Sequence, residues 1–180
     1  MIYEPAEDSY LLQEQVKIFV KTNMEVLDVG TGSGIQALTA KKQGANVLAI
    51  DINPKCVEFT REQGVEAITS DLFSNVKGKF DIIIFNPPYL PEEPLEPKDS
   101  ALSTTGGKKG NEILARFLAE AKNYLKENGK ILIVFSSLTP DVDQLIEECG
   151  FTFEKLSEQK IDFETLYVYL INLSKLSRKI

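Results

Sequence analysis

The sequence predicts a doubly wound α/β fold, in which seven strands form one mostly parallel sheet within a single domain that spans residues 1–180. Three observations lead to this prediction. Apolar segments typical of buried strands alternate with segments of helical periodicity. A glycine-rich turn at residues 30–34 joins the first strand to a helix. Two β-rich segments close the chain, and they predict an antiparallel edge strand near the C-terminus.

The first half of the chain is expected to hold a helix followed by strands and helices in alternation. Apolar residues recur at helical spacing after Asp8 or Ser9, either of which can cap the first helix, and that helix should end near Asn23. The later segments expected in this half are a strand at 24–30, a helix at 35–43 stopped by Gly44, a strand at 46–51, a helix capped by Asn53 and opened by Pro54, and a strand at 65–69.

The second half begins with the apolar run 82–85, which predicts a fourth strand that stops at Asn86. Residues 90–110 show no periodicity, and their length and position favour a substrate-facing lid, with a disordered segment as the alternative. The remaining expected elements are a helix at 111–126, a strand at 130–135, a helix opened by Thr139-Pro140 and closed by Gly150, and strands at 151–161 and 166–173.

The composition argues against several classes of protein. The sequence shows no secretory signal and no apolar stretch that could span a bilayer, and its two cysteines lack metal-ligand spacing, so we expect a cytoplasmic protein with reduced thiols. The chain has no histidine, which excludes an imidazole general base, a Ser-His-Asp triad and histidine-containing zinc sites. The net charge of −7 disfavours nucleic acid as a partner.

The segment Asn86-Pro87-Pro88-Tyr89 ends the predicted fourth strand. Neither proline has an N–H to continue a ladder, and Pro87 holds the preceding residue in an extended conformation. A carboxamide, a carbonyl and an aromatic ring therefore lie at the carboxyl end of a strand, where open α/β sheets bind ligands. A turn stabilised by its own asparagine is the alternative interpretation.

Acidic residues accompany three successive predicted strands. Asp28 precedes glycines spaced Gly-x-Gly-x-Gly, which let a ligand approach the backbone but differ from the Gly-x-Gly-x-x-Gly of dinucleotide sites. Asp51 can accept hydrogen bonds from ribose hydroxyls, and Asp71 can accept one from an adenine amino group. A carboxylate beside the turn repels a pyrophosphate and suits a cation. Taken alone each aspartate is more simply a turn residue, but together they predict S-adenosylmethionine, a nucleoside that carries a sulfonium and an ammonium group.

The sequence resembles the class I S-adenosylmethionine-dependent methyltransferases over nearly its whole length. Residues 28–34 (Asp-Val-Gly-Thr-Gly-Ser-Gly) are similar to their first motif, Asp51 to their ribose acid and Ser70-Asp71 to their adenine-side motif. The resemblance implies a Rossmann-like methyltransferase fold. Residues 86–89 are similar to the motif of members that methylate a nitrogen conjugated to a planar system, including adenine-N6 DNA enzymes, guanine-N2 RNA enzymes and HemK-type glutamine enzymes.

A narrower resemblance is to the archaeal and eukaryotic branch of the HemK-type family. It is carried by residues 3–12 (Tyr-Glu-Pro-Ala-Glu-Asp-Ser-Tyr-Leu-Leu) and 106–112 (Gly-Gly-x-x-Gly-x-Glu). It implies methylation of the glutamine amide in the Gly-Gly-Gln motif of a class I release factor, a translation termination protein. It also implies a small zinc-binding activator as partner in a heterodimer. The branch includes lysine-methylating members, and the separate N-terminal helical domain of bacterial HemK-type enzymes is not found in this sequence.

The predicted chemistry needs neither a metal nor a general base. The side-chain oxygen of Asn86 and the carbonyl of Pro87 accept both hydrogens of the target NH2, which aligns its nitrogen with the sulfonium methyl and stabilises the positive charge that develops on it. Tyr89 either favours the cationic methyl through its ring face or packs under the lid. The product is S-adenosylhomocysteine. The cofactor-binding candidates are Glu7, Ser9, Asp28, Gly30, Thr31, Gly32, Gly34, Asp51, Ile52, Asp71, Leu72 and Asn86.

Two other functions stay open at this point. The same four-residue motif serves adenine-N6 or guanine-N2 methylation of nucleic acid, although the acidic charge argues against it. A catalytically silent subunit of a heterodimer is the second alternative. For any partner, the strand at 65–69 is expected at an edge of the sheet, where unpaired backbone groups allow a partner strand to add.

Overall fold

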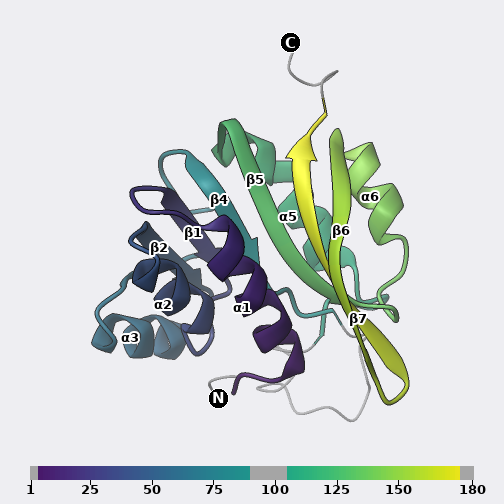
Figure 1. The fold of residues 1–180 in the computed structure, drawn as a ribbon, viewed down its shortest axis with the longest axis horizontal. Coiled ribbons are helices and arrows are strands. Elements are labelled where there is room, and N and C mark those ends of the chain that lie inside the picture. Colours follow the sequence, from purple (N-terminus) through teal and green to yellow (C-terminus); the bar gives the residue numbers. More distant parts are fainter. Residues whose placement is uncertain (1–3, 90–104, 175–180) are drawn as a thin grey trace.

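The computed structural model describes residues 4–89 and 105–174 (Figure 1). Among these residues, seven strands form one sheet in the order β3-β2-β1-β4-β5-β7-β6. The five strands from β3 to β5 are parallel, and β7 runs antiparallel to both of its neighbours. The strands are β1 (Glu25–Val29), β2 (Asn46–Asp51), β3 (Glu66–Thr69), β4 (Phe80–Phe85), β5 (Leu125–Ser136), β6 (Phe151–Ile161) and β7 (Glu164–Leu173).

This sheet confirms the predicted doubly wound α/β class and the mostly parallel sheet of seven strands. The prediction that strand 65–69 lies at an edge is also confirmed, because β3 has β2 as its neighbour on one side only. At the other end, the antiparallel strand β7 lies one place in from the edge, and β6 forms the edge itself. The strand order reverses between β1 and β4, which is where sheets of this kind hold their ligands.

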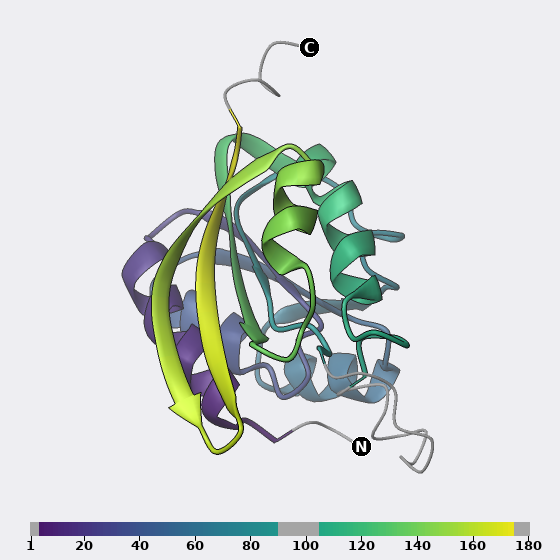
Figure 2. The same ribbon diagram turned by 90° about the vertical axis from the view of Figure 1, so that its right-hand side faces the viewer.

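Helices cover both faces of the sheet (Figures 1 and 2). On one face, Val16 packs in a cluster with Ile84 of β4, whereas on the other Phe85 lies 4.5 Å from Phe117, ring centroid to ring centroid. Successive residues of β4 therefore pack against helices on opposite faces of the sheet, as the pleat of a strand requires. The helices α1 (Glu7–Phe19), α2 (Ile35–Lys42) and α3 (Pro54–Glu62) lie on the first face, and α5 (Glu112–Ala121) and α6 (Val142–Glu148) lie on the second.

The first helix differs from the expectation at both ends. Its N-cap is Ala6 and not Asp8 or Ser9, which lie inside the first turn with their side chains bonded to other groups. The helix ends at Phe19 and not near Asn23. Asn23 adopts φ 65 and donates its N–H to the Gly44 carbonyl, so the last residues before β1 form a turn in place of a further helical turn.

Two later helices also have boundaries that differ from the prediction: α5 ends earlier, and α6 begins later. The helix expected to reach Lys126 ends at Ala121, followed by a 3₁₀ turn, η1 (Lys122–Tyr124). The chain turns there because Leu125 pairs with Phe80 of β4 as the first residue of β5. The helix expected to open at Thr139-Pro140 begins at Val142, because its N-cap, Asp141, is in the left-handed conformation with φ 59.

The cap at Asn53 is confirmed, since its side chain accepts a hydrogen bond from the Lys55 N–H with Pro54 at the start of α3. Most of the predicted lid, residues 90–104, lies outside the described residues. Within residues 4–89 and 105–174, no helix is long and apolar enough to cross a membrane.

Candidate functional site

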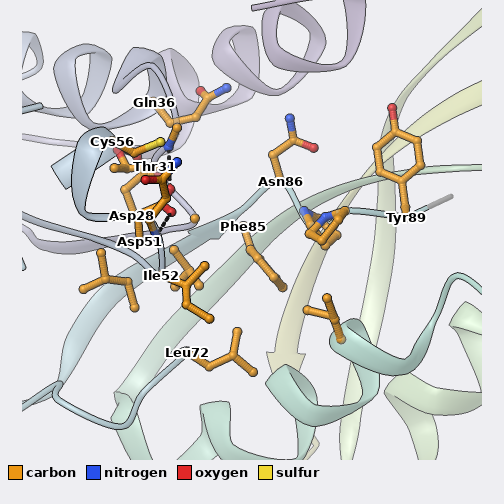
Figure 3. Close-up of a pocket in the computed structure, with 18 of the residues that line it drawn as sticks. Asp28, Thr31, Gln36, Asp51, Ile52, Cys56, Leu72, Phe85, Asn86 and Tyr89 are labelled. Atoms are coloured by element: carbon orange, nitrogen blue, oxygen red, sulfur yellow. Dashed lines mark hydrogen bonds between the residues drawn. The ribbon is translucent and has the colours of Figure 1, made fainter. Parts of the chain in front are cut away.

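A cavity of about 880 Å³ lies at the carboxyl ends of β1, β2, β3 and β4. Its size lies within the usual range for small-molecule sites. Figure 3 shows Asp28 and Asp51 on one side of it and Asn86 and Tyr89 on the other. The predicted site residues that line the cavity are Ser9, Asp28, Gly30, Thr31, Gly32, Asp51, Ile52, Asp71, Leu72, Asn86, Pro87 and Tyr89.

Glu7 and Gly34 are the two predicted site residues that do not line this cavity. Glu7 is exposed in the first turn of α1. Gly34 is the N-cap of α2 with φ 79, and a Cβ there would lie 3.2 Å from the Thr60 hydroxyl oxygen. A glycine at this position is thus explained by the turn into α2 and by the close approach of Thr60.

Asp28 is buried at the base of the glycine turn. Its Oδ2 accepts hydrogen bonds from the Thr31 hydroxyl at 2.7 Å and from the Ala37 N–H at 3.1 Å. Burial raises its pKa to about 7, and the charge of Asp51 adds to the rise. A cation entering the cavity would stabilise the ionised carboxylate and bring this pKa down. Asp28 is therefore suited to a positively charged ligand, and its contact with one stays a prediction.

Asp51 is held in place by the backbone at the end of β2. Its Oδ2 accepts from the Gly32 N–H at 2.9 Å and its Oδ1 from the Asn53 N–H at 2.8 Å. Burial raises its pKa despite these bonds, and burial together with the Asp51 charge raises the pKa of the neighbouring Cys56 thiol to about 11. The Cys56 thiol and the Ile52 N–H also bond to this carboxylate. Asp51 lines the cavity, where its carboxylate can accept hydrogen bonds from a diol.

At the rim of the cavity, Asp71 has a partner that the sequence did not reveal. Its Oδ2 forms an ion pair with Arg116 of α5 at 3.0 Å, and both side chains are about half exposed. The adjacent Leu72 lines the cavity with the unusual φ of 46, and its carbonyl accepts a hydrogen bond from the Ser70 hydroxyl. The Ser70-Asp71 motif thus shapes the turn after β3, in addition to any contact that Asp71 makes with a ligand.

The side chains of Asn86 and Tyr89 both bond to the carboxylate of Asp8, which is distant from them in the sequence. Asn86 Nδ2 and the Tyr89 hydroxyl each donate to Asp8 Oδ2 at 3.1 Å. The Asn86 Oδ1 is buried and has no hydrogen-bond partner among the residues that the structure describes. A buried carbonyl oxygen without a partner is costly, and such atoms in a cavity mark positions where a ligand donor fits.

Sequence reasoning missed Asp8 and Gln36 as members of the site. Gln36, in the first turn of α2, donates from Nε2 to the Ser9 carbonyl at 2.8 Å, and its buried Oε1 has no partner among the described residues. Both residues line the cavity. The available signal for Gln36 was its position: a buried polar side chain directly after the glycine turn lies where a helix N-terminus meets a ligand.

The described end of the predicted lid also reaches the cavity, through Thr105, Gly107 and Lys108. The carboxylate of Glu112 accepts hydrogen bonds from the N–H groups of Lys109 and Gly110 and so holds this turn at the start of α5. A lid that closes over a substrate remains a prediction.

With the geometry established, comparison with known proteins decides the family. Residues 8–163 match the family described as methyltransferase small domain. The chain belongs to this family. A relative from Methanocaldococcus jannaschii, named as a protein N5-glutamine methyltransferase, is 43% identical over 178 residues, which cover 93% of this chain and 89% of the relative.

Two further comparisons agree with the first. The methyltransferase HEMK2 of Mus musculus is 32% identical over 151 residues, which cover 74% of this chain and 71% of the HEMK2 chain. A solved structure of the Mtq2–Trm112 complex of E. cuniculi, responsible for the methylation of the eRF1 translation termination factor, superposes with a TM-score of 0.78 at 27% identity, covering 96% of this chain and 98% of that chain. The predicted class, an S-adenosylmethionine-dependent methyltransferase of the HemK-type group, is confirmed.

Proposed function

We propose that this methyltransferase transfers a methyl group to the side-chain amide nitrogen of a protein glutamine. The observation that carries the proposal is the buried Oδ1 of Asn86, which has no partner among the described residues while Nδ2 is bonded to Asp8. Because Asn86 lines the cavity, an acceptor that still lacks a donor lies beside it. A glutamine NH2 has two hydrogens, and the carbonyl of Pro87, the next residue along, offers a second acceptor.

The two acceptors would position the substrate nitrogen and assist its reaction. An amide nitrogen is a weak nucleophile because its lone pair is delocalised into the carbonyl. Asn86 and Pro87 fix its orientation and stabilise the positive charge that develops as its bond to the methyl forms. The N-alkylated amide cation is strongly acidic and loses its proton readily, so a chain without histidine can carry out the reaction.

The residues of the cavity fit S-adenosylmethionine, which supplies an electrophilic methyl group on its sulfonium when bound. Asp28 would hold the positively charged end, and Asp51 would accept from the ribose hydroxyls. The buried Gln36 Oε1 offers an acceptor to the ammonium group. Ile52 and Leu72 would cover the adenine, with Asp71 beside it.

We infer that the glutamine belongs to the Gly-Gly-Gln motif of a class I release factor. The relatives support this inference, because one is named for glutamine N5 methylation and another complex acts on a termination factor. A heterodimer with a small zinc-binding activator belongs to the same proposal, supported by the two-protein composition of that complex. The proposal also places the reaction in the cytoplasm. It assigns residues 1–180 to one methyltransferase domain.

The test is a methylation assay with labelled S-adenosylmethionine. Three substrates are offered side by side: a class I release factor, the same factor with the glutamine of its Gly-Gly-Gln motif changed to alanine, and nucleic acid. Label on the unaltered factor alone supports the proposal. Label that persists on the altered factor points to another side chain, such as lysine, and label on nucleic acid favours the nucleobase alternative.

A further inference from the structure

The first turn of α1 is built into the acceptor side of the cavity. Asp8 is only 4% exposed, and its two carboxylate oxygens have different neighbours. Oδ1 accepts from the N–H and hydroxyl of Ser9, while Oδ2 accepts from Asn86 Nδ2 and the Tyr89 hydroxyl. A single carboxylate therefore contacts both polar side chains of the Asn-Pro-Pro-Tyr turn.

We propose that Asp8 is a positioning residue that fixes the orientation of the Asn86 carboxamide, and that it thereby makes asparagine, and not aspartate, the residue this chain requires at position 86. The proposal deepens the proposed function, because it concerns the acceptor that the substrate NH2 would meet. Asp8 itself need not touch the substrate.

The physical basis is the polarity of the two side chains. A carboxamide has nearly the same shape when its oxygen and nitrogen exchange places, so packing alone holds neither orientation. A carboxylate can only accept, which means that Asp8 bonds to Asn86 Nδ2 and repels Oδ1. The preference for one orientation should be on the order of 10- to 100-fold, the usual worth of one charge-assisted hydrogen bond. In the reverse orientation Asn86 would turn its NH2 toward the substrate NH2, where two donors meet without an acceptor.

Asp8 can act in this way because α1 is firmly attached to the fold. Leu12 and Val16 are fully buried against the sheet, and Gln13 donates to the Thr39 hydroxyl of α2 at 2.9 Å. Gln36 donates to the carbonyl of Ser9, directly after Asp8. The carboxylate therefore sits on an anchored helix, which is the condition for holding a neighbouring side chain in one orientation.

The same contact restricts which residue can occupy position 86. An aspartate there would bring a second carboxylate to within hydrogen-bond distance of Asp8, and two acceptors of like charge repel. Exchanging the two residues restores a donor: in Asp8→Asn/Asn86→Asp, the new carboxamide at position 8 can donate to the new carboxylate at position 86. That carboxylate would still present an oxygen to the substrate NH2.

The test compares Asp8→Ala, Asn86→Asp and the exchange Asp8→Asn/Asn86→Asp, with the exposed acid change Asp162→Asn as control. Melting temperature, cofactor affinity and single-turnover methylation are measured on the same preparations. We expect Asp8→Ala to lower the methylation rate by about 10- to 100-fold, with cofactor affinity nearly unchanged. Asn86→Asp should lose more, and the exchange should regain at least about tenfold over it. A merely structural role for Asp8 predicts no such regain.

A second measurement does not depend on the substrate. In ¹⁵N-labelled protein, the Asn86 side-chain NH2 signal is identified by its absence in Asn86→Asp. We expect one of its protons to exchange slowly with solvent in the parent protein and to lose that protection in Asp8→Ala. The role of Asp8 is overturned if the Asn86 NH2 protons remain protected from solvent in Asp8→Ala. It is also overturned if the double variant Asp8→Asn/Asn86→Asp is no more active than Asn86→Asp. A parent protein that binds cofactor but never methylates glutamine overturns the proposed function instead, and the NMR result then decides the role of Asp8 alone.

Discussion

The carboxylate of Asp51 and the N–H of Gly32 are joined by a hydrogen bond of 2.9 Å, which ties the end of β2 to the glycine turn that follows β1. The other oxygen of Asp51 accepts from the Asn53 N–H at the start of α3. One side chain thus fixes two backbone turns on the cofactor side of the cavity. Its position is set before any ligand arrives, so little ordering cost remains to be met on binding.

The first prediction is that S-adenosylmethionine binds, that NAD does not, and that Asp51→Ala weakens cofactor binding. Losing two hydrogen bonds from ribose hydroxyls to a charged acceptor should cost about 2–4 kcal/mol, or about 30- to 1,000-fold in the dissociation constant. Isothermal titration calorimetry measures this directly. Glu58→Ala, an exposed change on α3, is the control and should bind like the parent. If the parent and Asp51→Ala bind S-adenosylmethionine with equal affinity, Asp51 does not contact the cofactor.

The second prediction concerns Asp28 and the pH dependence of stability. The folded protein holds its pKa at about 7, against 3.8 for an ordinary aspartate, so folding favours the protonated form. The stabilising contribution is therefore complete below about pH 3.8 and is lost as the pH rises toward 7. Its full size is on the order of 4 kcal/mol, and the raised pKa of the neighbouring Asp51 acts in the same direction.

Urea unfolding between pH 4.5 and pH 7.5 tests this prediction in the ligand-free protein. The parent should lose stability relative to Asp28→Asn as the pH rises, because the asparagine cannot ionise. Asp162→Asn, which changes an exposed acid, should follow the parent. A constant difference between the parent and Asp28→Asn across this range would show that Asp28 has no raised pKa. If the cationic cofactor favours ionised Asp28, its affinity for the parent should also rise over this range, by up to about tenfold per pH unit.

Local sequence patterns were sufficient to place the glycine turn, Asp28 and Asp51 together beside the cavity. The glycine turn, Asp28 and Asp51 lie within one strand–helix–strand unit, where the fold dictates that successive strand ends meet. Other parts of the site depend on contacts between residues far apart in the sequence: Asp8 bonds to Asn86 from 78 positions away, and Arg116 bonds to Asp71 from 45. No periodicity or turn signal reports such pairings, because helix docking, and not local conformation, creates them. The place of β7 inside the edge strand β6 was hidden as well, because it is set by the pairing of β7 with the distant strand β5.

The third prediction concerns docking of a partner strand at β3. Ser70 donates its N–H to the Asp51 carbonyl, so the alternation of a strand turns the backbone groups of Ala67 and Thr69 away from β2. The carbonyls of these two residues accept from the Arg61 guanidinium at 2.7 Å and from the Asn75 side chain at 3.0 Å. These side chains protect the edge, and an added strand would have to replace them.

Ala67→Pro removes an outward N–H from this edge and should weaken capture of the activator protein in a pull-down assay. Arg61→Ala is the matched variant: it uncovers a carbonyl without removing an N–H, and it should bind at least as well as the parent. Circular dichroism checks that both variants remain folded. If folded Ala67→Pro captures the activator as strongly as the parent does, the partner docks elsewhere.

The last prediction separates chemistry from binding at Asn86. Asn86 lines the cavity, and its Oδ1 has no partner among the described residues. If this oxygen accepts from the substrate NH2 as proposed, Asn86→Ala should keep most of its affinity for S-adenosylmethionine while losing an acceptor that strengthens as the nitrogen becomes positive. Removing one such contact typically lowers the rate about 10²- to 10³-fold. An asparagine that only stabilises its own turn predicts a different result, in which stability, cofactor affinity and activity fall together. Melting temperature, cofactor calorimetry and single-turnover methylation on one preparation distinguish the two. A folded, cofactor-bound Asn86→Ala protein that methylates at the parent rate would rule out the proposed mechanism.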